Sequence, residues 1–432
     1  MKAVLPYGKE TVVFDIEDAR VRGVLRSRIE SYVPDAAEEE LVERALRNPI
    51  GSAPLCELAR GKHRVTVIAS DHTRPVPSRI LMPRLLREIR RGNPDAQITV
   101  LVATGCHRGT TLRELTEKFG EQIVRNEHIV VHDCDDTENL VHLGTLPSGG
   151  ECRISRFAAD ADLLAAEGFI EPHFFAGFSG GRKSVLPGVA GRKSVLANHC
   201  AEFIADPHAR TGNLTGNPIH RDMVWAAKQA GLRFILNVVL NCEKRVIRAF
   251  AGDPAYAHEA GCGFLDAQCG VAPVPADIVI TSNGGYPLDQ NIYQAVKGMT
   301  AAEACVNRGG VIIMAAKSED GHGGDAFCRE MSASDDLDVL SRGILARGRN
   351  ATQPDQWQAQ ILIRVLQKAH VIYMSDADDE LVRSLHMIPA HSPQEAMALA
   401  GRLLGRDDAS VTVIPDGVAV TVRQSADAPP VN

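Results

Sequence analysis

The chain has 432 residues, 44% of them hydrophobic, and a formal net charge of −7. Its length exceeds what one ordinary hydrophobic core accommodates and predicts two domains, while its composition excludes wholesale disorder. The acidic balance argues against a protein that binds nucleic-acid backbone, and no apolar run is long enough to cross a bilayer.

The N-terminal sequence lacks the apolar core of a signal peptide, because Lys9, Glu10 and Asp15 interrupt it. The ten cysteines are scattered between Cys56 and Cys328 and form no CxxC pair. These features predict a cytoplasmic protein with reduced thiols.

Runs of β-forming residues alternate with amphipathic stretches along the chain, which predicts an α/β fold with mostly parallel sheets. The expected strands are Val65–Ser70, Gln97–Ala103, Asp162–Ala166, Phe234–Leu240, Asp277–Ser282, Val311–Ala316, His370–Ser375 and Val411–Pro415. The expected helices are Ser78–Arg91, Ile219–Ala230, Asp355–Lys368 and Pro393–Leu404.

The segment Gly261–Ala276 has the glycine and proline content of a linker, so we expect domains at 1–270 and 271–432. The last strands, on either side of a turn at Pro415–Gly417, could pair with either domain. The tail, Ser425–Asn432, is expected to fray.

Polar side chains follow the first expected strand: Asp71, Thr73 and Arg74. Ligands in open α/β sheets bind at the carboxyl ends of strands, and arginine there suits a carboxylate or a phosphate. The alternative is a polar cap on the helix that begins at Ser78. His107 follows the next strand, where it is either an acid/base group or a structural loop histidine.

The glycine-rich run 168–184 is the densest candidate site, because its small residues would let backbone N–H groups approach an anion. Gly177–Ser184 departs from a phosphate-binding P-loop where Arg182 replaces the second glycine, so ATP chemistry is not expected. Ser179 fits a nucleophile elbow, although the sequence after it is a poor helix start. Lys183 could be a nucleophile activated by its cationic neighbour, or the run could be a mobile surface loop.

Two further features belong to this set. His199 is a possible metal ligand without a nearby histidine partner, and a lone histidine is often structural. In the second domain, Tyr293, Gln294 and Lys297, together with Gln290, fall on one predicted helix face after a glycine-rich loop. That face could bind a substrate carboxylate or could simply be solvated.

Taken together, these segments resemble the nickel-dependent lactate racemase family, including its hydroxyacid racemase and epimerase relatives. The matching blocks occur in both halves of the chain, in the family's order and spacing. They are SDHTRP (70–75), TGCHR (104–108), EPHFFAGFSGGRKSVLPG (171–188), NH (198–199), TGNPIH (215–220) and NGGYPLDQNIYQAVKGM (283–299).

The resemblance implies a nickel-pincer nucleotide: a pyridinium-3,5-bisthiocarboxylic acid mononucleotide that carries Ni(II). Lys183 matches the lysine that tethers it, with Lys193 in the repeated GRKSVL sequence as a remote second choice, and His199 matches the protein ligand to nickel. Soft sulfur donors suit Ni(II). The remaining residues implied to contact the cofactor are Asp71, Thr73, Arg74, Ser179, Gly180 and Gly181.

The same resemblance implies racemisation or epimerisation of a 2-hydroxy acid by reversible hydride transfer at Cα. His107 and His173 match the paired acid/base histidines, and the residues implied to hold the substrate are Arg74, Tyr293, Gln294 and Lys297. It implies two α/β domains with Rossmann-like sheets around an active-site cleft. The implied partners are the small-molecule hydroxy acid and the enzymes that build the cofactor, with no nucleic acid and no membrane.

Two other classes of function stay open from the residues alone. One is a serine hydrolase that uses Ser179 in GFSGG. The other is a non-catalytic protein that binds a nucleotide cofactor, although binding alone does not require the two histidines.

Overall fold

The computed structural model describes residues 1–423, so the tail expected to fray lies outside the described residues. The chain divides into two compact units. The first unit comprises residues 29–199 and 206–267, and the second comprises 1–28, 200–205 and, among the described residues, 268–423.

The first unit is built on a six-stranded sheet in the order β13-β12-β9-β4-β5-β6, in which only β13 runs antiparallel to its neighbour. The central strands are almost continuously buried, as expected for parallel strands that helices cover on both faces. The strands are β4 (Arg64–Ser70), β5 (Gln97–Ala103), β6 (His128–Val131), β9 (Leu163–Phe169), β12 (Leu232–Leu240) and β13 (Val246–Gly252).

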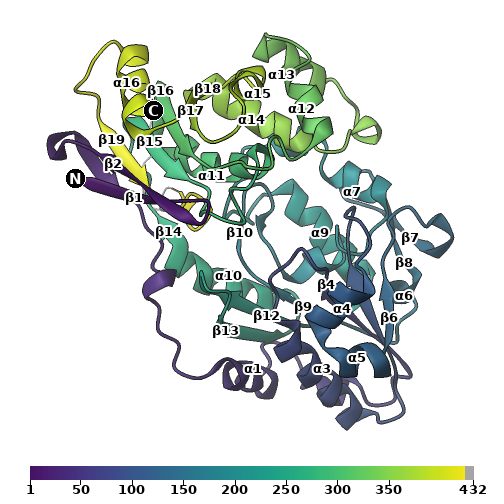
Figure 1. Ribbon diagram of the computed structural model, residues 1–432. Helices are drawn as coiled ribbons and strands as arrows, with labels where there is room; N and C mark the ends of the chain where they lie inside the picture. The colour runs from purple at the N-terminus through teal and green to yellow at the C-terminus, as the bar shows by residue number, and fades with distance from the viewer. Residues whose placement is uncertain (424–432) are drawn as a thin grey trace. The chain divides into compact units, whose positions relative to one another are not determined.

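Helices surround this sheet (Figure 1), and their sequences explain their ends. In α3 the apolar side chains recur at helical spacing and are buried, while Thr111 and Glu114 form a capping box at the start of α4. The helices are α1 (Glu38–Arg47), α2 (Leu55–Leu58), α3 (Ser78–Gly92), α4 (Leu112–Phe119), α5 (Glu121–Asn126), α6 (Arg156–Ala159), α7 (Arg192–Asn198), α9 (Pro218–Gln229) and most of α10 (Tyr256–Cys269). Two hairpins complete the unit: β7 (Leu140–Thr145) with β8 (Glu151–Ser155), and β10 (Pro172–His173) with β11 (Gly177–Phe178).

The second unit has its own six-stranded sheet, entirely parallel, in the order β18-β17-β16-β15-β19-β3. The strands are β3 (Val21–Val24), β15 (Ala276–Ser282), β16 (Val306–Ala315), β17 (His370–Met374), β18 (Ile388–Ala390) and β19 (Val411–Ile414). The smaller strand pairs are β1 (Lys2–Tyr7) with β2 (Glu10–Asp15), and β14 (Gly270–Val271) with β20 (Thr421–Val422). The helices are α8 (Ala201–Ala205), α11 (Ile292–Cys305), α12 (Asp325–Met331), α13 (Leu337–Leu345), α14 (Gln356–Lys368), α15 (Asp379–Ser384) and α16 (Pro393–Leu404).

The first 28 residues pack with the second unit rather than with the chain that follows them, which differs from the domain expected at 1–270. The reason is β-pairing: Val21 lies beside Val411, and Val24 beside Val413. In Figure 1 the purple N-terminal hairpin accordingly lies beside the yellow strand β19. The last strands pair inside this unit, and the change of unit at Gln268 falls close to the expected boundary.

The linker expected at Gly261–Ala276 is wrong over its first half, where α10 continues to Cys269. Gly261 allows close packing against this helix, because a Cβ there would lie 2.2 Å from the Ile170 side chain. The mixed α/β class with large, mostly parallel sheets is confirmed, and each expected strand and helix coincides with an observed one.

Among the described helices, none combines the length and apolar character that a membrane span requires.

Candidate active site

Three adjacent strands of the first unit, β9, β4 and β5, end at the same edge of the sheet, and the predicted residues follow them. Asp71 comes directly after β4, His107 follows β5, and the segment from Ile170 to Lys183 follows β9. Ligands bind at this edge in open α/β sheets. The parallel topology thus gathers at one edge the polar residues that the sequence separates.

Asp71 and His107 form the best-defined contact of the site. Nδ1 of His107 donates to Oδ2 of Asp71 at 2.8 Å, and the Thr73 hydroxyl donates to Oδ1 at 2.7 Å. Burial of the Asp71 carboxylate opposes its ionisation, but the hydrogen bonds from His107 and Thr73 outweigh that cost and lower its pKa. Since the proton of neutral His107 is held on Nδ1, its basic lone pair is on Nε2.

His173 is in the opposite tautomer. Its Nδ1 accepts a hydrogen bond of 3.3 Å from the backbone N–H of Ala176, which places the proton of the neutral ring on Nε2. The ring is half-buried, stacks on Phe174 at 5.1 Å between centroids and meets the edge of Phe175 at 4.5 Å. The two predicted acid/base histidines therefore differ in what Nε2 offers: a base in His107 and a proton donor in His173.

The hydroxyl of Ser179 in the glycine-rich segment is hydrogen-bonded to backbone groups. The Ser179 hydroxyl donates to the carbonyl of Phe169 and accepts from the N–H of Glu171, each at 2.9 Å, and the side chain is buried. The Ser179 N–H donates to the carbonyl of Glu171. The strand before it has only two residues, and a short 3₁₀ turn, Gly181–Ser184, follows it instead of a helix. This is not the geometry of a nucleophile elbow.

Gly180 and Gly181 shape the segment through close packing. Both have positive φ angles, 76° and 53°, and the Gly181 N–H donates to Oδ1 of Asn237 at 2.7 Å. Because protein acceptors occupy the N–H groups of Ser179 and Gly181, the backbone donors expected for an anion are already used there. Cofactor contacts by these residues stay a prediction.

Arg182 has a buried guanidinium group that holds this segment in place through hydrogen bonds. It donates to the carbonyl of Ala176 at 2.8 Å and to Nε2 of His258 at 2.8 Å, and burial lowers its pKa to about 10. No carboxylate bonds to it among the residues that the structure describes. The arginine that breaks the P-loop pattern is thus a structural cation.

Replacing Gly181 by alanine is expected to destabilise the first unit by about 2–5 kcal/mol, measured by urea denaturation. The new Cβ would lie 2.8 Å from the buried ring of His258 and would also require a left-handed backbone. Gly61→Ala is the matched control, because Gly61 also has a positive φ but has no atom within 4 Å of its Cβ position. Equal losses in the two variants would contradict the packing role.

Lys183 and His199 meet the chemical requirements of the roles that the resemblance implies. Nδ1 of His199 donates to the carbonyl of Val195 at 2.9 Å, which leaves the metal-binding lone pair on Nε2. Burial, and then the charge of nearby Lys183, lower the pKa of His199 to about 4. The imidazole is neutral at neutral pH, as a metal ligand must be. Lys183 is half-buried near this ring, whereas Lys193 is exposed.

The lowered pKa of His199 predicts a loss of stability in acid. An unfolded histidine binds its proton near pH 6.5, but the folded one does so only near pH 4, so stability is full above pH 6.5 and falls as the pH drops towards 4. That shift corresponds to about 3 kcal/mol. Urea denaturation of the cofactor-free chain should show a fall smaller by about this amount in His199→Gln. If the free energy of unfolding depends on pH in the same way in the two proteins, the lowered pKa of His199 is contradicted.

The substrate residues expected in the second unit lie on or beside α11. The helix begins at Ile292 with Asn291 as its N-cap, so Gln290 lies outside the shared face that the sequence predicted. Lys297 donates from Nζ to Oε1 of Gln294 at 2.5 Å, and both are half-buried. The Tyr293 hydroxyl donates to Asp355 at 3.1 Å, which directs it to the residue before α14.

Several supporting residues were missed by the sequence reasoning. Asn237 was the detectable one, because it is a fully buried amide inside the apolar strand β12. Lys118 donates to the carbonyl of Arg74, and burial lowers its pKa near buried Glu167. His258 and Lys118 lie in ordinary helical sequence, with no local pattern to reveal them.

Comparison with known proteins shows the family of this chain and agrees with its fold. The lactate racemase N-terminal domain matches residues 7–212, and the lactate racemase C-terminal domain matches residues 271–422. The chain therefore belongs to the lactate racemase family. It is an isomerase, a racemase.

The relatives cover nearly the whole chain. A lactate racemase of Thermoanaerobacterium thermosaccharolyticum is 55% identical over 421 residues, and one of Lactiplantibacillus plantarum is 53% identical over 420; each alignment spans 97% of this chain and 99% of the relative. The solved lactate racemase apoprotein from T. thermosaccharolyticum superposes with a TM-score of 0.95 at 54% identity, over 98% of this chain and all of that one. A Thermotoga maritima protein at 20% identity shares the fold, with a TM-score of 0.64 over 91% of this chain and all of that one.

Proposed function

We propose that this racemase interconverts the enantiomers of a small 2-hydroxy acid, with lactate as the first substrate to test. The observation that carries the proposal is the pair of histidines in opposite tautomers, His107 and His173. A racemase must handle the hydroxyl proton of either enantiomer, so one base is not enough. The names of the relatives support lactate as the substrate.

His107 is the base in the resting arrangement. It removes the substrate hydroxyl proton through Nε2 and becomes an imidazolium that the adjacent Asp71 carboxylate stabilises across their 2.8 Å contact. The lowered pKa of Asp71 keeps that carboxylate ionised throughout the working pH range.

In the same direction of reaction, His173 donates a hydrogen bond from Nε2–H to the substrate oxygen and keeps its proton. For the other enantiomer the roles exchange: His173 carries its proton on Nδ1 and accepts the hydroxyl proton at Nε2, while His107, as the imidazolium, donates from Nε2–H and keeps its Nδ1–H on Asp71. The shift of the His173 proton gives up the bond from the Ala176 N–H to Nδ1, which is long at 3.3 Å.

The cofactor that we propose is the nickel-pincer nucleotide, held covalently by Lys183 and through nickel by His199. When bound, this group supplies the acceptor for the hydride of the substrate Cα. The neutral state of His199 and its fixed tautomer fit a ligand to Ni(II). Further contacts are assigned to the loop after β4 and to the glycine-rich segment: Asp71, Thr73, Arg74, Ser179, Gly180 and Gly181.

The substrate carboxylate needs cationic partners, because an unpaired anion in a closed site is costly. We assign Arg74, Gln294 and Lys297 to this contact, with Tyr293 as a further substrate residue. Cofactor-building enzymes are the proposed maturation partners, and the proposed location is the cytoplasm.

The other two classes of function are less well supported. A serine hydrolase needs a base at the Ser179 hydroxyl, and the two bonds of that hydroxyl go to backbone groups. A non-catalytic carrier does not require His107 to be bonded to a buried carboxylate and presented to solvent.

The test is a racemisation assay of the chain co-expressed with cofactor-building enzymes. L-lactate and D-lactate should each approach the same equal mixture by chiral chromatography, and the chain produced without those enzymes should be inactive. A fluorophosphonate probe should leave Ser179 unlabelled. Labelled Ser179 with no racemisation would contradict the proposal and favour the hydrolase.

A further inference from the structure

Two cysteines are brought together beside the proposed base. β5 and β6 are parallel neighbours, with Val102 beside Val131. Cys106 comes three residues after the end of β5, and Cys134 comes three residues after the end of β6. Because the two strands are hydrogen-bonded neighbours that run in the same direction, the short segments that carry the two cysteines leave the sheet at the same edge, one beside the other.

The segments that follow β5 and β6 are hydrogen-bonded to each other close to the two thiols. The Thr104 hydroxyl donates to the carbonyl of His132 at 2.6 Å, and the thiols of Cys106 and Cys134 are hydrogen-bonded to each other. Cys134 is 5% exposed, whereas Cys106 is half-buried and open to a small reagent. The bond to Cys106, followed by burial, raises the pKa of Cys134, so the buried thiol keeps its proton and Cys106 is the accepting sulfur.

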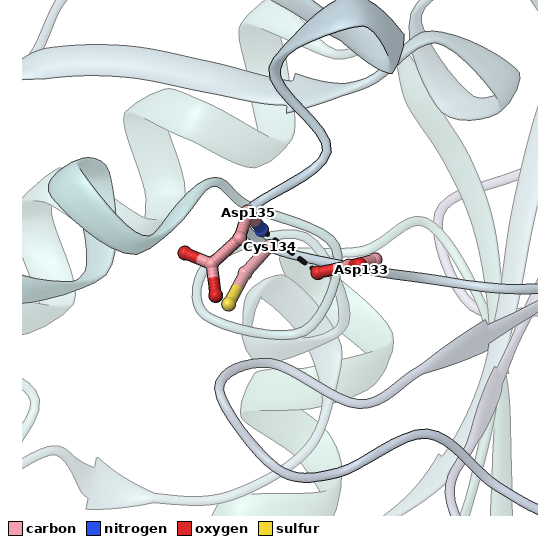
Figure 2. Close-up of side chains that lie close together, drawn as sticks. All are labelled: Asp133, Cys134 and Asp135. Atoms are coloured by element: carbon pink, nitrogen blue, oxygen red, sulfur yellow. Dashed lines mark hydrogen bonds between the residues drawn. The ribbon is translucent and has the colours of Figure 1, made fainter.

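The charges around the pair favour a reactive thiol over a metal site. Figure 2 shows Asp133, Cys134 and Asp135, whose potential ligand atoms lie within 4.8 Å of one another. However, Arg192 pairs with both oxygens of Asp135, at 2.8 and 2.7 Å, and Asp133 accepts from the Asp135 N–H. The positive charge of Arg192 lies near both sulfurs and partly offsets, at Cys134, the rise in pKa that Cys106, burial and Asp135 cause.

We propose that Cys106 and Cys134 are an oxidative modification site, at which a small peroxide converts the two thiols into a reversible intramolecular disulfide. The Cys106 thiolate attacks one peroxide oxygen, breaks the O–O bond and becomes a sulfenic acid, and the released hydroxide takes a proton to form water. The Cys134 sulfur then displaces the sulfenic hydroxyl, which leaves as a second water, and the S–S bond forms. Hydrogen peroxide is reduced to two waters, and a dithiol reverses the change.

The disulfide would act directly on the active site, because Cys106 precedes His107 in the chain. Closing the bond draws the segment after β5 towards the segment after β6 and alters the 2.8 Å contact from His107 to Asp71. This effect on racemisation rests on the proposed function, whereas formation of the disulfide does not.

The experiment treats the reduced full-length chain, without cofactor, with hydrogen peroxide and then blocks the remaining thiols with iodoacetamide. Digestion uses trypsin with a glutamate-specific protease, since cleavage after Glu138 separates Cys134 from Cys152. Mass spectrometry should find the Cys106 and Cys134 peptides cross-linked, two hydrogens lighter than their sum, and separated again by dithiothreitol.

Matched variants make the result specific. Cys106→Ser and Cys134→Ser should each abolish the cross-link, and Cys242→Ser, at an exposed cysteine outside the pair, should leave it intact. The inference is overturned if peroxide oxidises Cys242 while both paired thiols stay alkylatable, or if Cys106 proceeds to a sulfinic acid without a cross-link. The same experiment on cofactor-loaded enzyme separates the two proposals. If the cross-link forms but the enzyme did not racemise lactate even before peroxide was added, the proposed function is contradicted and the disulfide is not.

Discussion

Substitution of His107 by glutamine in the cofactor-loaded chain is expected to lower the kcat for lactate racemisation by about 10²–10⁴-fold. Glutamine keeps a hydrogen-bond donor for Asp71 but has no basic nitrogen at neutral pH. The variant should therefore fold and retain its cofactor while the proton transfer fails. Asp71→Asn should also lower kcat, because it removes the carboxylate that orients the ring and stabilises its charge.

The measurement is the initial rate from each pure enantiomer, with cofactor content determined in the same samples. His142→Gln is the matched control, since His142 is a solvent-exposed histidine of the same unit that lies near Glu151. It should keep the parent rate. A His107→Gln variant that racemises at the parent rate with a full cofactor load would show that another group is the base.

Substitution of His199 by alanine is expected to remove nickel while the nucleotide stays attached to Lys183. The buried neutral imidazole is the one protein ligand that we assign, and loss of a ligand lowers metal affinity by at least about 10–100-fold. Nickel should fall from about one ion per chain to a small fraction of that, measured by elemental analysis after dialysis. Activity should fall in proportion.

An exposed histidine of the same unit provides the control for this experiment. His208→Ala should keep its nickel, because that ring pairs with Asp206 on the surface. Far-ultraviolet circular dichroism should show that both variants are folded. Retention of nickel by folded His199→Ala would contradict the assignment of His199 as the ligand.

Much of the fold was predictable because buried parallel strands have a strong local pattern. Gln97–Ala103 was predicted with the bounds that the structure gives it, and Asp277–Ser282 differs from its strand by one residue. The place of residues 1–28 was not predictable, since it depends on strand pairing across nearly the whole chain. The linker error at Gly261 arose because a glycine needed for close packing in a helix has the same letter as a glycine in a loop.

The site was predictable in its composition but not in its hydrogen bonding. The resemblance supplied His107, His173, Lys183 and His199, and the sheet brings the first three to loops at one edge. No sequence pattern could show which nitrogen of each ring carries the proton, because the folded geometry decides it through the Asp71 carboxylate at His107 and the Ala176 N–H at His173. Nor could it show that the N–H groups of Ser179 and Gly181 are already paired.

The most direct test of the account is peptide mapping of the chain co-expressed with cofactor-building enzymes, combined with a nickel measurement. We predict a pincer-nucleotide adduct on the peptide that contains Lys183, an unmodified Lys193, and nickel that disappears in Lys183→Ala but not in Lys193→Ala. An unmodified Lys183 and no bound nickel, in cells shown to make the cofactor, would contradict the account and leave a racemase fold without the proposed chemistry.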